Sequence, residues 1–143
     1  MNLQIIQHGT AAYNQMLQLR IKVLLNPIGV SPSFINTEKE KEDILIAAFE
    51  EQDMVGCCVL TKRDKETVQL RQMAVDDVVQ GKGVGSAIIQ FAEQVAKENG
   101  YSTIMMHARS AVVPFYLKNG YYVTGDAFEE VGIAHRFMQK KLL

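Results

Sequence analysis

The strongest pattern in the sequence is a run of apolar residues at helical spacing over Val84–Asn99, followed by the stop signal Asn99-Gly100. This pattern predicts an amphipathic helix. A second run with apolar residues every three or four positions, Thr10–Leu24, predicts another helix, with Thr10 as its N-cap. The remaining segments must therefore be arranged around these two helices.

Between these helices, three apolar runs are typical of β-strands, and short polar segments of the kind found in hairpin turns separate them. They predict an antiparallel meander. In the third run the apolar positions change from even to odd numbers across Arg71 and Gln72, which predicts a β-bulge at this point. The three runs are Ile44–Phe49, Val55–Leu60 and Val68–Val75.

The rest of the chain continues the alternation of strands and helices. A short strand is predicted around Leu3 and Ile5, and Asn26–Asn36, which contains two prolines, is predicted to be irregular. The charged run Glu38–Asp43 is predicted to form a solvated turn or helical piece. Further along, we expect strand Thr103–His107, helix Val112–Lys118, and the closing strands Tyr121–Thr124 and Ile133–Lys140.

Composition narrows the class of protein. The chain has 143 residues with no repeat or linker, so one domain spanning residues 1–143 is expected. Fifteen basic and sixteen acidic residues give a net charge of -1, which disfavours nucleic acid as a partner. The adjacent Cys57 and Cys58 predict no disulfide and no cysteine-rich metal site. No apolar run approaches the roughly 20 residues of a membrane helix, so a cytoplasmic protein without membrane or metal is expected.

The segment with the clearest chemical character is QGKGVGS, residues 80–86, at the start of the long helix. Glycine-rich turns at a helix N-terminus expose backbone N–H groups at the positive end of the helix dipole and so can hold a phosphate or pyrophosphate. The alternative is that the glycines only form a tight turn. Lys82 is followed by Gly83, so the Walker pattern fails, and the glycine spacing also departs from the dinucleotide-binding fingerprint.

Gln80, Gly83 and Gly85 occupy a Gln-x-x-Gly-x-Gly pattern that resembles the acetyl-CoA signature of the GNAT superfamily of N-acetyltransferases. The similarity extends to LRQMAV before this loop and to AVVPFYLKNGYYV after the helix, covering the chain from about Ile44 to its end. The sequence looks most similar to a group of small bacterial GNAT proteins that are mostly uncharacterised. The resemblance implies an α/β (α+β) fold with a mixed, mostly antiparallel sheet, splayed at the acetyl-CoA site and flanked by helices.

The resemblance also implies a division of roles among the residues. Backbone groups of the bulged strand would hydrogen-bond the pantetheine arm of acetyl-CoA, and the glycine turn would hold its pyrophosphate. Arg109 stands where relatives often have an asparagine that contacts the coenzyme arm, and an arginine at this position can instead reach a phosphate or a substrate carboxylate. The implied cofactor-binding residues are Met73, Ala74, Val75, Gln80, Gly81, Lys82, Gly83, Val84, Gly85, Ser86, Arg109 and Tyr116.

For catalysis, the resemblance places Tyr116 near the coenzyme sulfur as general acid and the backbone N–H of Val75 as oxyanion donor, with Ala74 as the other possible donor. A phenol is protonated at neutral pH and can give a proton to a leaving thiolate. The alternative for Tyr116 is a packing role. For the general base, Glu129, Glu130, His135 and a water chain all stay open.

The function that follows is an acyltransferase that passes acetyl directly from acetyl-CoA to a primary amine, without a metal. We expect the first helix and the Asn26–Asp43 loop to select the acceptor, and they do not identify it. His107 points toward the cleft or serves as a structural histidine. The competing hypotheses are a non-catalytic CoA-binding sensor or interaction module and a nucleotide-binding protein. A homodimer is possible, since symmetric dimers are the commonest assembly.

Overall fold

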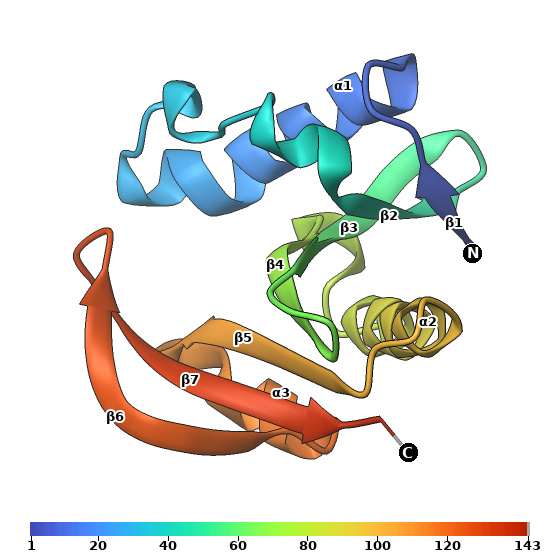
Figure 1. Ribbon diagram of the computed structural model, residues 1–143. Helices are drawn as coiled ribbons and strands as arrows, with labels where there is room; N and C mark the ends of the chain where they lie inside the picture. Colours follow the sequence, from blue (N-terminus) through green and yellow to red (C-terminus); the bar gives the residue numbers. More distant parts are fainter. Residues whose placement is uncertain (143) are drawn as a thin grey trace.

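The computed structural model describes residues 1–142, which form a seven-stranded sheet of order β1-β2-β3-β4-β5-β7-β6 with helices on both faces (Figure 1). Each neighbouring pair is antiparallel except β4 and β5. The predicted mixed, mostly antiparallel sheet is therefore confirmed. The strands are β1 (Asn2–Ile6), β2 (Ile44–Glu50), β3 (Asp53–Lys62), β4 (Thr67–Val75), β5 (Thr103–Arg109), β6 (Tyr122–Glu130) and β7 (Ile133–Lys141).

The helices agree with the predicted ones in position and differ in detail. Helix α1 (Ala11–Arg20) begins at the predicted N-cap, where the Thr10 hydroxyl accepts from the Tyr13 N–H. It continues as a π-helical stretch, η1 (Ile21–Leu25), before the irregular loop. The other helices are α2 (Val84–Glu98) and α3 (Val113–Lys118), with 3₁₀ turns η2 (Asn26–Ile28), η3 (Pro32–Phe34), η4 (Lys39–Glu42), η5 (Asp77–Val79) and η6 (Ser110–Val112).

Two apolar layers hold the helices to the sheet. One contains α2 and α3 against one face, centred on fully buried side chains such as Ile88, Ile104 and Met138. The other contains α1 against the opposite face of the first strands and is built around Met16. In Figure 1, α1 lies over the β1–β4 part of the sheet, whereas α2 lies on the opposite face.

The charged run Glu38–Asp43 is helical in part, as η4, but the expectation that it is solvated is wrong for Glu40. That carboxylate is 2% exposed, and both of its oxygens accept hydrogen bonds from the guanidinium of Arg20 on α1. The Tyr13 hydroxyl donates to it as well, at 2.6 Å. Because these three polar groups satisfy one another, the loop that carries Glu40 is fixed to α1.

The last hairpin is longer than its sequence suggests. β6 runs from Tyr122 to Glu130, although the polar Gly125-Asp126 pair predicts an end near Thr124. The pairing with β7 shifts register between Thr124 and Phe128 and then resumes, so the strand survives as an irregular one. Because of this extension, Glu130 lies at the end of β6, next to the turn that leads into β7.

Candidate active site

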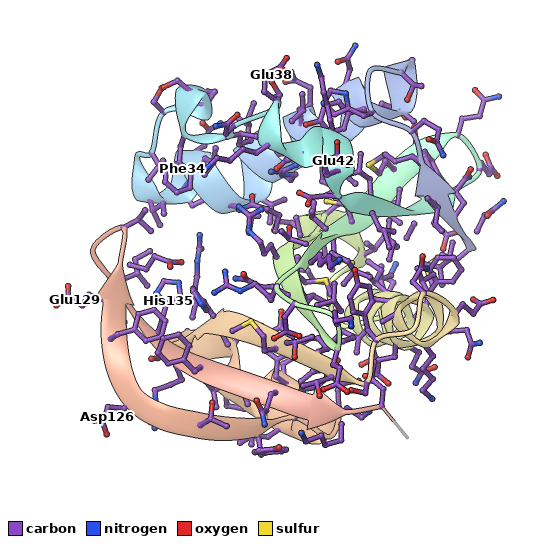
Figure 2. All side chains as sticks on the ribbon, in the orientation of Figure 1. Phe34, Glu38, Glu42, Asp126, Glu129 and His135 are labelled. Carbon is purple, nitrogen blue, oxygen red and sulfur yellow. The ribbon has the colours of Figure 1, made fainter. Side chains whose placement is uncertain are left out.

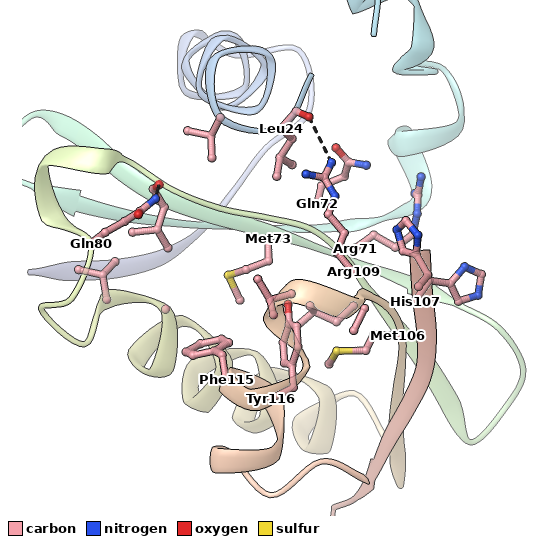
Figure 3. A pocket seen from close by; sticks show the side chains of 18 of the residues that line it. Leu24, Arg71, Gln72, Met73, Gln80, Met106, His107, Arg109, Phe115 and Tyr116 are labelled. Carbon is pink, nitrogen blue, oxygen red and sulfur yellow. Dashed lines mark hydrogen bonds between the residues drawn. The ribbon is translucent and has the colours of Figure 1, made fainter. Parts of the chain in front are cut away.

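Strands β4 and β5 form a cleft because they pair only at one end. Thr67, Val68 and Gln69 lie opposite Thr103, Ile104 and Met105, and beyond these three pairs the two strands have no ladder between them. A cavity of about 890 Å³ opens where they separate, lined by both strands, the start of α2, α3, the η1–η3 segment and the turn of the last hairpin (Figure 3).

The bulge in β4 is where the sequence predicts it. Arg71 pairs with Val59 and Ala74 with Cys57, so Gln72 and Met73 together face the single residue between them on β3. Gln72 has φ +56°, a left-handed conformation that costs a non-glycine residue roughly 1–2 kcal/mol. Its side-chain oxygen accepts a hydrogen bond from Arg20 Nε at 3.2 Å, which ties the bulge to the buried Arg20–Glu40 pair.

Beyond the bulge, the backbone of Val75 faces the cleft. The Asp76 N–H donates to Val55 O on β3 at 2.8 Å, and backbone groups alternate in direction along a strand, so the N–H and C=O of Val75 point away from β3. The Gln80 side chain donates to that carbonyl at 3.1 Å. Ala74 points the other way: its backbone faces β3 and its side chain is buried beside α1.

The glycine turn before α2 fits an anion. Gly81 and Gly83 have φ of +82° and +79°, and a Cβ atom built on either would meet nothing within 4 Å. The first backbone hydrogen bond of the helix runs from the Ala87 N–H to Gly83 O, so the N–H groups of residues 83–86 have no acceptor within the helix, whereas the Lys82 N–H donates to Val79 O at 3.3 Å. Gly83 has no side chain to cap them. Free donors, open space and the helix dipole all occur at one point on the cavity wall.

Tyr116, on α3, presents its hydroxyl to the cavity (Figure 3). Its ring is 6% exposed and packs edge-on against Phe115 and Tyr121. Within residues 1–142, Arg136 Nε is the one fully buried side-chain polar atom without a partner, so the hydroxyl of Tyr116 is in contact with cavity space. Burial raises the pKa of this phenol well above its usual value, which keeps it protonated.

At the turn between β6 and β7, the carboxylate of Glu130 lies between two histidines. Glu130 Oε1 is 3.0 Å from His107 Nδ1, and Glu130 Oε2 is 3.8 Å from His135 Nε2. An ionised carboxylate only accepts, so His107 donates from Nδ1; in a neutral imidazole with this tautomer the lone pair is on Nε2. His135 Nδ1 donates to Ile133 O at 2.7 Å. The two imidazoles are thereby held in defined orientations.

Most of the predicted site residues lie on this cavity. Ala74 and Lys82 do not line it, and of the candidate bases Glu129 does not either; Figure 2 shows Glu129 on the outer side of β6 and His135 on the inner side. The predicted residues that line the cavity are Met73, Val75, Gln80, Gly81, Gly83, Val84, Gly85, Ser86, Arg109, Tyr116, Glu130 and His135, with His107.

Sequence reasoning missed two features of the wall. Arg71 lines the cavity, although in the sequence it marks only the change of parity in β4. The other feature is the set of apolar loop residues that line the cavity, Ile28, Val30 and Phe34, since the sequence predicts only that the Asn26–Asp43 loop selects the acceptor. No local signal in the sequence distinguishes these residues from ordinary loop residues.

The model of the acetyltransferase (GNAT) domain matches residues 28–142 of this sequence. The chain belongs to the GNAT family of acetyltransferases. Among residues 1–142, no cluster of three or more His, Cys, Asp or Glu side chains could hold a metal ion, and no helix is long and apolar enough to cross a membrane.

Curated GNAT relatives match at moderate identity. The uncharacterised N-acetyltransferase YjcF of Bacillus subtilis is 31% identical over 104 residues, 72% of this chain and 74% of YjcF. A Xenopus tropicalis protein named "Probable N-acetyltransferase 14" is 31% identical over 86 residues, 57% of this chain. The chain spans 42% of the length of that protein and 51% of that of Bacillus subtilis YyaT.

The fold recurs in solved GNAT structures. The crystal structure of an aminoglycoside 6'-N-acetyltransferase complexed with coenzyme A superimposes with a TM-score of 0.84, covering 100% of this chain and 98% of that one. The sequence identity is 15%, so the likeness concerns the fold.

Proposed function

We propose that this protein transfers an acetyl group from acetyl-CoA directly to a primary amine. The observation that carries the proposal is the convergence, on one cavity, of a glycine turn with free N–H donors, an unpaired strand edge and a protonated phenol. Two structures of the same fold, the coenzyme A complex above and a GNAT acetyltransferase of Elizabethkingia anophelis with acetyl-CoA bound, support the choice of ligand.

The residues of the cavity fit the coenzyme. The space above Gly81 and Gly83, which a side chain would fill, suits a pyrophosphate, with Lys82 adding positive charge nearby. The unpaired edge of β4 suits an extended pantetheine arm, which would add to the sheet as a further strand does. Val75 and Met73 contribute to that edge, whereas Ala74 faces β3 and is not retained in this role.

Acetyl-CoA would supply the acetyl group as an activated thioester. The Val75 N–H, pointing into the cleft, donates to the oxygen that gains negative charge during acyl transfer. The Tyr116 hydroxyl, which is protonated at neutral pH, gives its proton to the departing sulfur.

The acceptor must lose a proton, and the imidazole of His107 is placed to take it. Glu130 holds the Nδ1 proton of this ring, so the lone pair on Nε2 is available. His107 lines the cavity, and no side chain of residues 1–142 occupies its Nε2. His135 is less suited, because its Nε2 faces the Glu130 carboxylate. We therefore propose His107 as the base and Glu130 as the residue that orients it.

The test is thermal unfolding with acetyl-CoA, with CoA and with ATP, followed by release of free thiol from acetyl-CoA in the presence of amines. A ligand bound only by the native state raises the unfolding midpoint. We expect a clear rise with acetyl-CoA and CoA, little with ATP, and amine-dependent thiol release. Binding without transfer to any amine would favour the sensor hypothesis, and no rise at saturating acetyl-CoA would refute both.

A further inference from the structure

Arg109 carries a charge that no side chain of the described residues neutralises. It reaches from β5 to η1, where its Nη2 donates to the backbone carbonyl of Leu24 at 3.2 Å. Within residues 1–142, no carboxylate forms an ion pair with it, in contrast to Arg20, which is paired with Glu40 at 2.7 Å. A half-buried guanidinium on a cavity wall with only a neutral acceptor is a binding position for an anion.

A second guanidinium lines the same part of the cavity. Arg71 is 4.0 Å from Asp43 and 3.4 Å from the Thr61 hydroxyl, both loose contacts. Figure 3 shows Arg71, Arg109 and His107 on neighbouring walls of the pocket. Glu130 is the one carboxylate among the described lining residues, and it is already held by His107. Positive charges therefore outnumber negative charges at this end of the cavity. This excess disfavours the binding of an amine that carries no negative group of its own.

The spacing of the groups fits a short zwitterion. His107 and Arg109 are two residues apart on β5, so their side chains share a face at a separation of roughly 7 Å. His135 lies opposite Arg109 on β7, on the same face. A molecule whose amine lies near His107 and Glu130 can thus place a carboxylate near Arg109 only if the two groups are a few bonds apart. Ile28, Val30 and Phe34 are apolar residues that line the same cavity.

We propose that the acceptor is an α-amino acid or a close analogue with an apolar side chain. Its carboxylate is bound by Arg109 with help from Arg71, its amine faces His107 and Glu130, and its side chain packs on the wall of the η2–η3 loop. This inference rests on the proposed acetyl transfer and adds the substrate class. On binding, the carboxylate replaces Leu24 O as the acceptor for Arg109.

The first test compares matched amines on the unmodified protein. Leucine and phenylalanine are measured against their decarboxylated counterparts, 3-methylbutylamine and 2-phenylethylamine, and against the methyl ester and amide of leucine, by thiol release from acetyl-CoA. We expect kcat/KM to be about 10- to 100-fold higher for the free amino acids, because the analogues leave the guanidinium without its partner. Equal or faster transfer to the analogues, or to polyamines, overturns the inference while leaving acetyl transfer standing.

The second test uses Arg109→Gln, with Lys65→Gln, in an exposed turn, as the control of equal charge change. We expect Arg109→Gln to abolish the preference for leucine over 3-methylbutylamine, mainly through KM of the amino acid, with KM of acetyl-CoA unchanged.

Arg71→Gln should cause a smaller loss of this preference, and it replaces Arg109→Gln in the test if that variant does not fold. A rise in KM for acetyl-CoA with the preference intact assigns Arg109 to the coenzyme and overturns the proposal. If acetyl-CoA gives no thermal protection and no thiol release, the proposed function itself fails, and the inference with it.

Discussion

Arg20 and Glu40 form a buried ion pair with two hydrogen bonds, Nη1 to Oε1 at 2.9 Å and Nη2 to Oε2 at 2.7 Å, between helix α1 and the loop that precedes β2. Both side chains are almost fully excluded from solvent. Through Nε, the same guanidinium reaches Gln72 in the bulge of β4. Arg20 thus connects α1, the loop that carries Glu40, and strand β4, which borders the cleft.

Glu40→Gln leaves this guanidinium buried without its counter-charge, so we expect the free energy of unfolding to fall by about 3–5 kcal/mol. Denaturant titration measures it. The matched control is Glu38→Gln, which breaks the exposed pair of Glu38 with Lys41 at 2.8 Å and should leave the midpoint unchanged. Equal effects of the two substitutions would mean that burial of the Arg20–Glu40 pair has no bearing on stability.

The same pair makes stability depend on pH in the acid range. Burial alone would raise the pKa of Glu40, but hydrogen bonds from Arg20 and Tyr13 outweigh it and hold the pKa below its usual value. A carboxyl whose pKa is lower in the folded state stabilises the fold above its unfolded pKa of about 4.3, and this stabilisation is lost as pH falls below it. We therefore expect a smaller loss of stability between pH 5 and 3 in Glu40→Gln than in the unmodified protein, measured by urea titrations at each pH.

Gln72 should respond to substitution in the reverse of the usual order. Alanine is normally favoured over glycine in ordered backbone, but φ +56° at this position favours glycine by roughly 1 kcal/mol. Both substitutions lose the hydrogen bond from Arg20 Nε, so their difference isolates the backbone strain. We expect Gln72→Gly to unfold at a higher urea concentration than Gln72→Ala. The opposite order would show that the bulge relaxes to another conformation.

What could be predicted from the sequence is what depends on local pattern. The glycine turn, helix α2 and the bulge of β4 each follow from residues within about ten positions of one another, because spacing fixes their geometry. The Arg20–Glu40 pair joins residues 20 positions apart, and the charge of Glu40 alone predicts a solvated residue. The contact of Arg109 with Leu24 spans 85 positions. Such pairings depend on the assembled sheet and leave no local periodicity.

The His107–Glu130 pair shows the same limit. Gly125 and Asp126 are poor strand residues, so the sequence predicts that the strand stops before them, far from Glu130. In the structure the register shift absorbs these residues and β6 continues. Glu130 could be named as a candidate base, but its partner could not, because the pairing depends on how the hairpin passes its irregular centre.

Gly83→Ala tests whether the glycine turn before α2 binds the pyrophosphate of acetyl-CoA. The substitution forces alanine into a left-handed conformation at a cost of about 1 kcal/mol and places a methyl group in the open space above the turn. Gly100→Ala is the matched control, since Gly100 also has positive φ and open surroundings but lies at the far end of α2. We expect equal losses of thermal stability but a decrease of about tenfold or more in acetyl-CoA affinity for Gly83→Ala alone, measured by calorimetric titration. If Gly83→Ala and Gly100→Ala bind acetyl-CoA with equal affinity, the coenzyme does not bind at the glycine turn before α2.

Tyr116→Phe separates catalysis from packing. Because the hydroxyl has no protein partner in the described residues, its removal should leave the unfolding midpoint nearly unchanged, while loss of a general acid lowers kcat by about 100-fold or more. KM for acetyl-CoA should stay within a factor of about two or three, since the ring is kept. Tyr101→Phe, on a half-buried phenol away from the cavity, serves as the control and should retain full activity.

The pH profile adds an independent check on the same residue. Burial raises the pKa of Tyr116, so the phenol stays protonated at and beyond the usual tyrosine pKa of about 10. We expect kcat of the unmodified protein to show no decline from ionisation of Tyr116 up to about pH 10; a decline near pH 10 that is absent from Tyr116→Phe would contradict the raised pKa. A phenylalanine variant with full activity would leave Tyr116 only its packing against Phe115 and Tyr121, and the proton for the departing sulfur would then have to come from another group on the cavity wall.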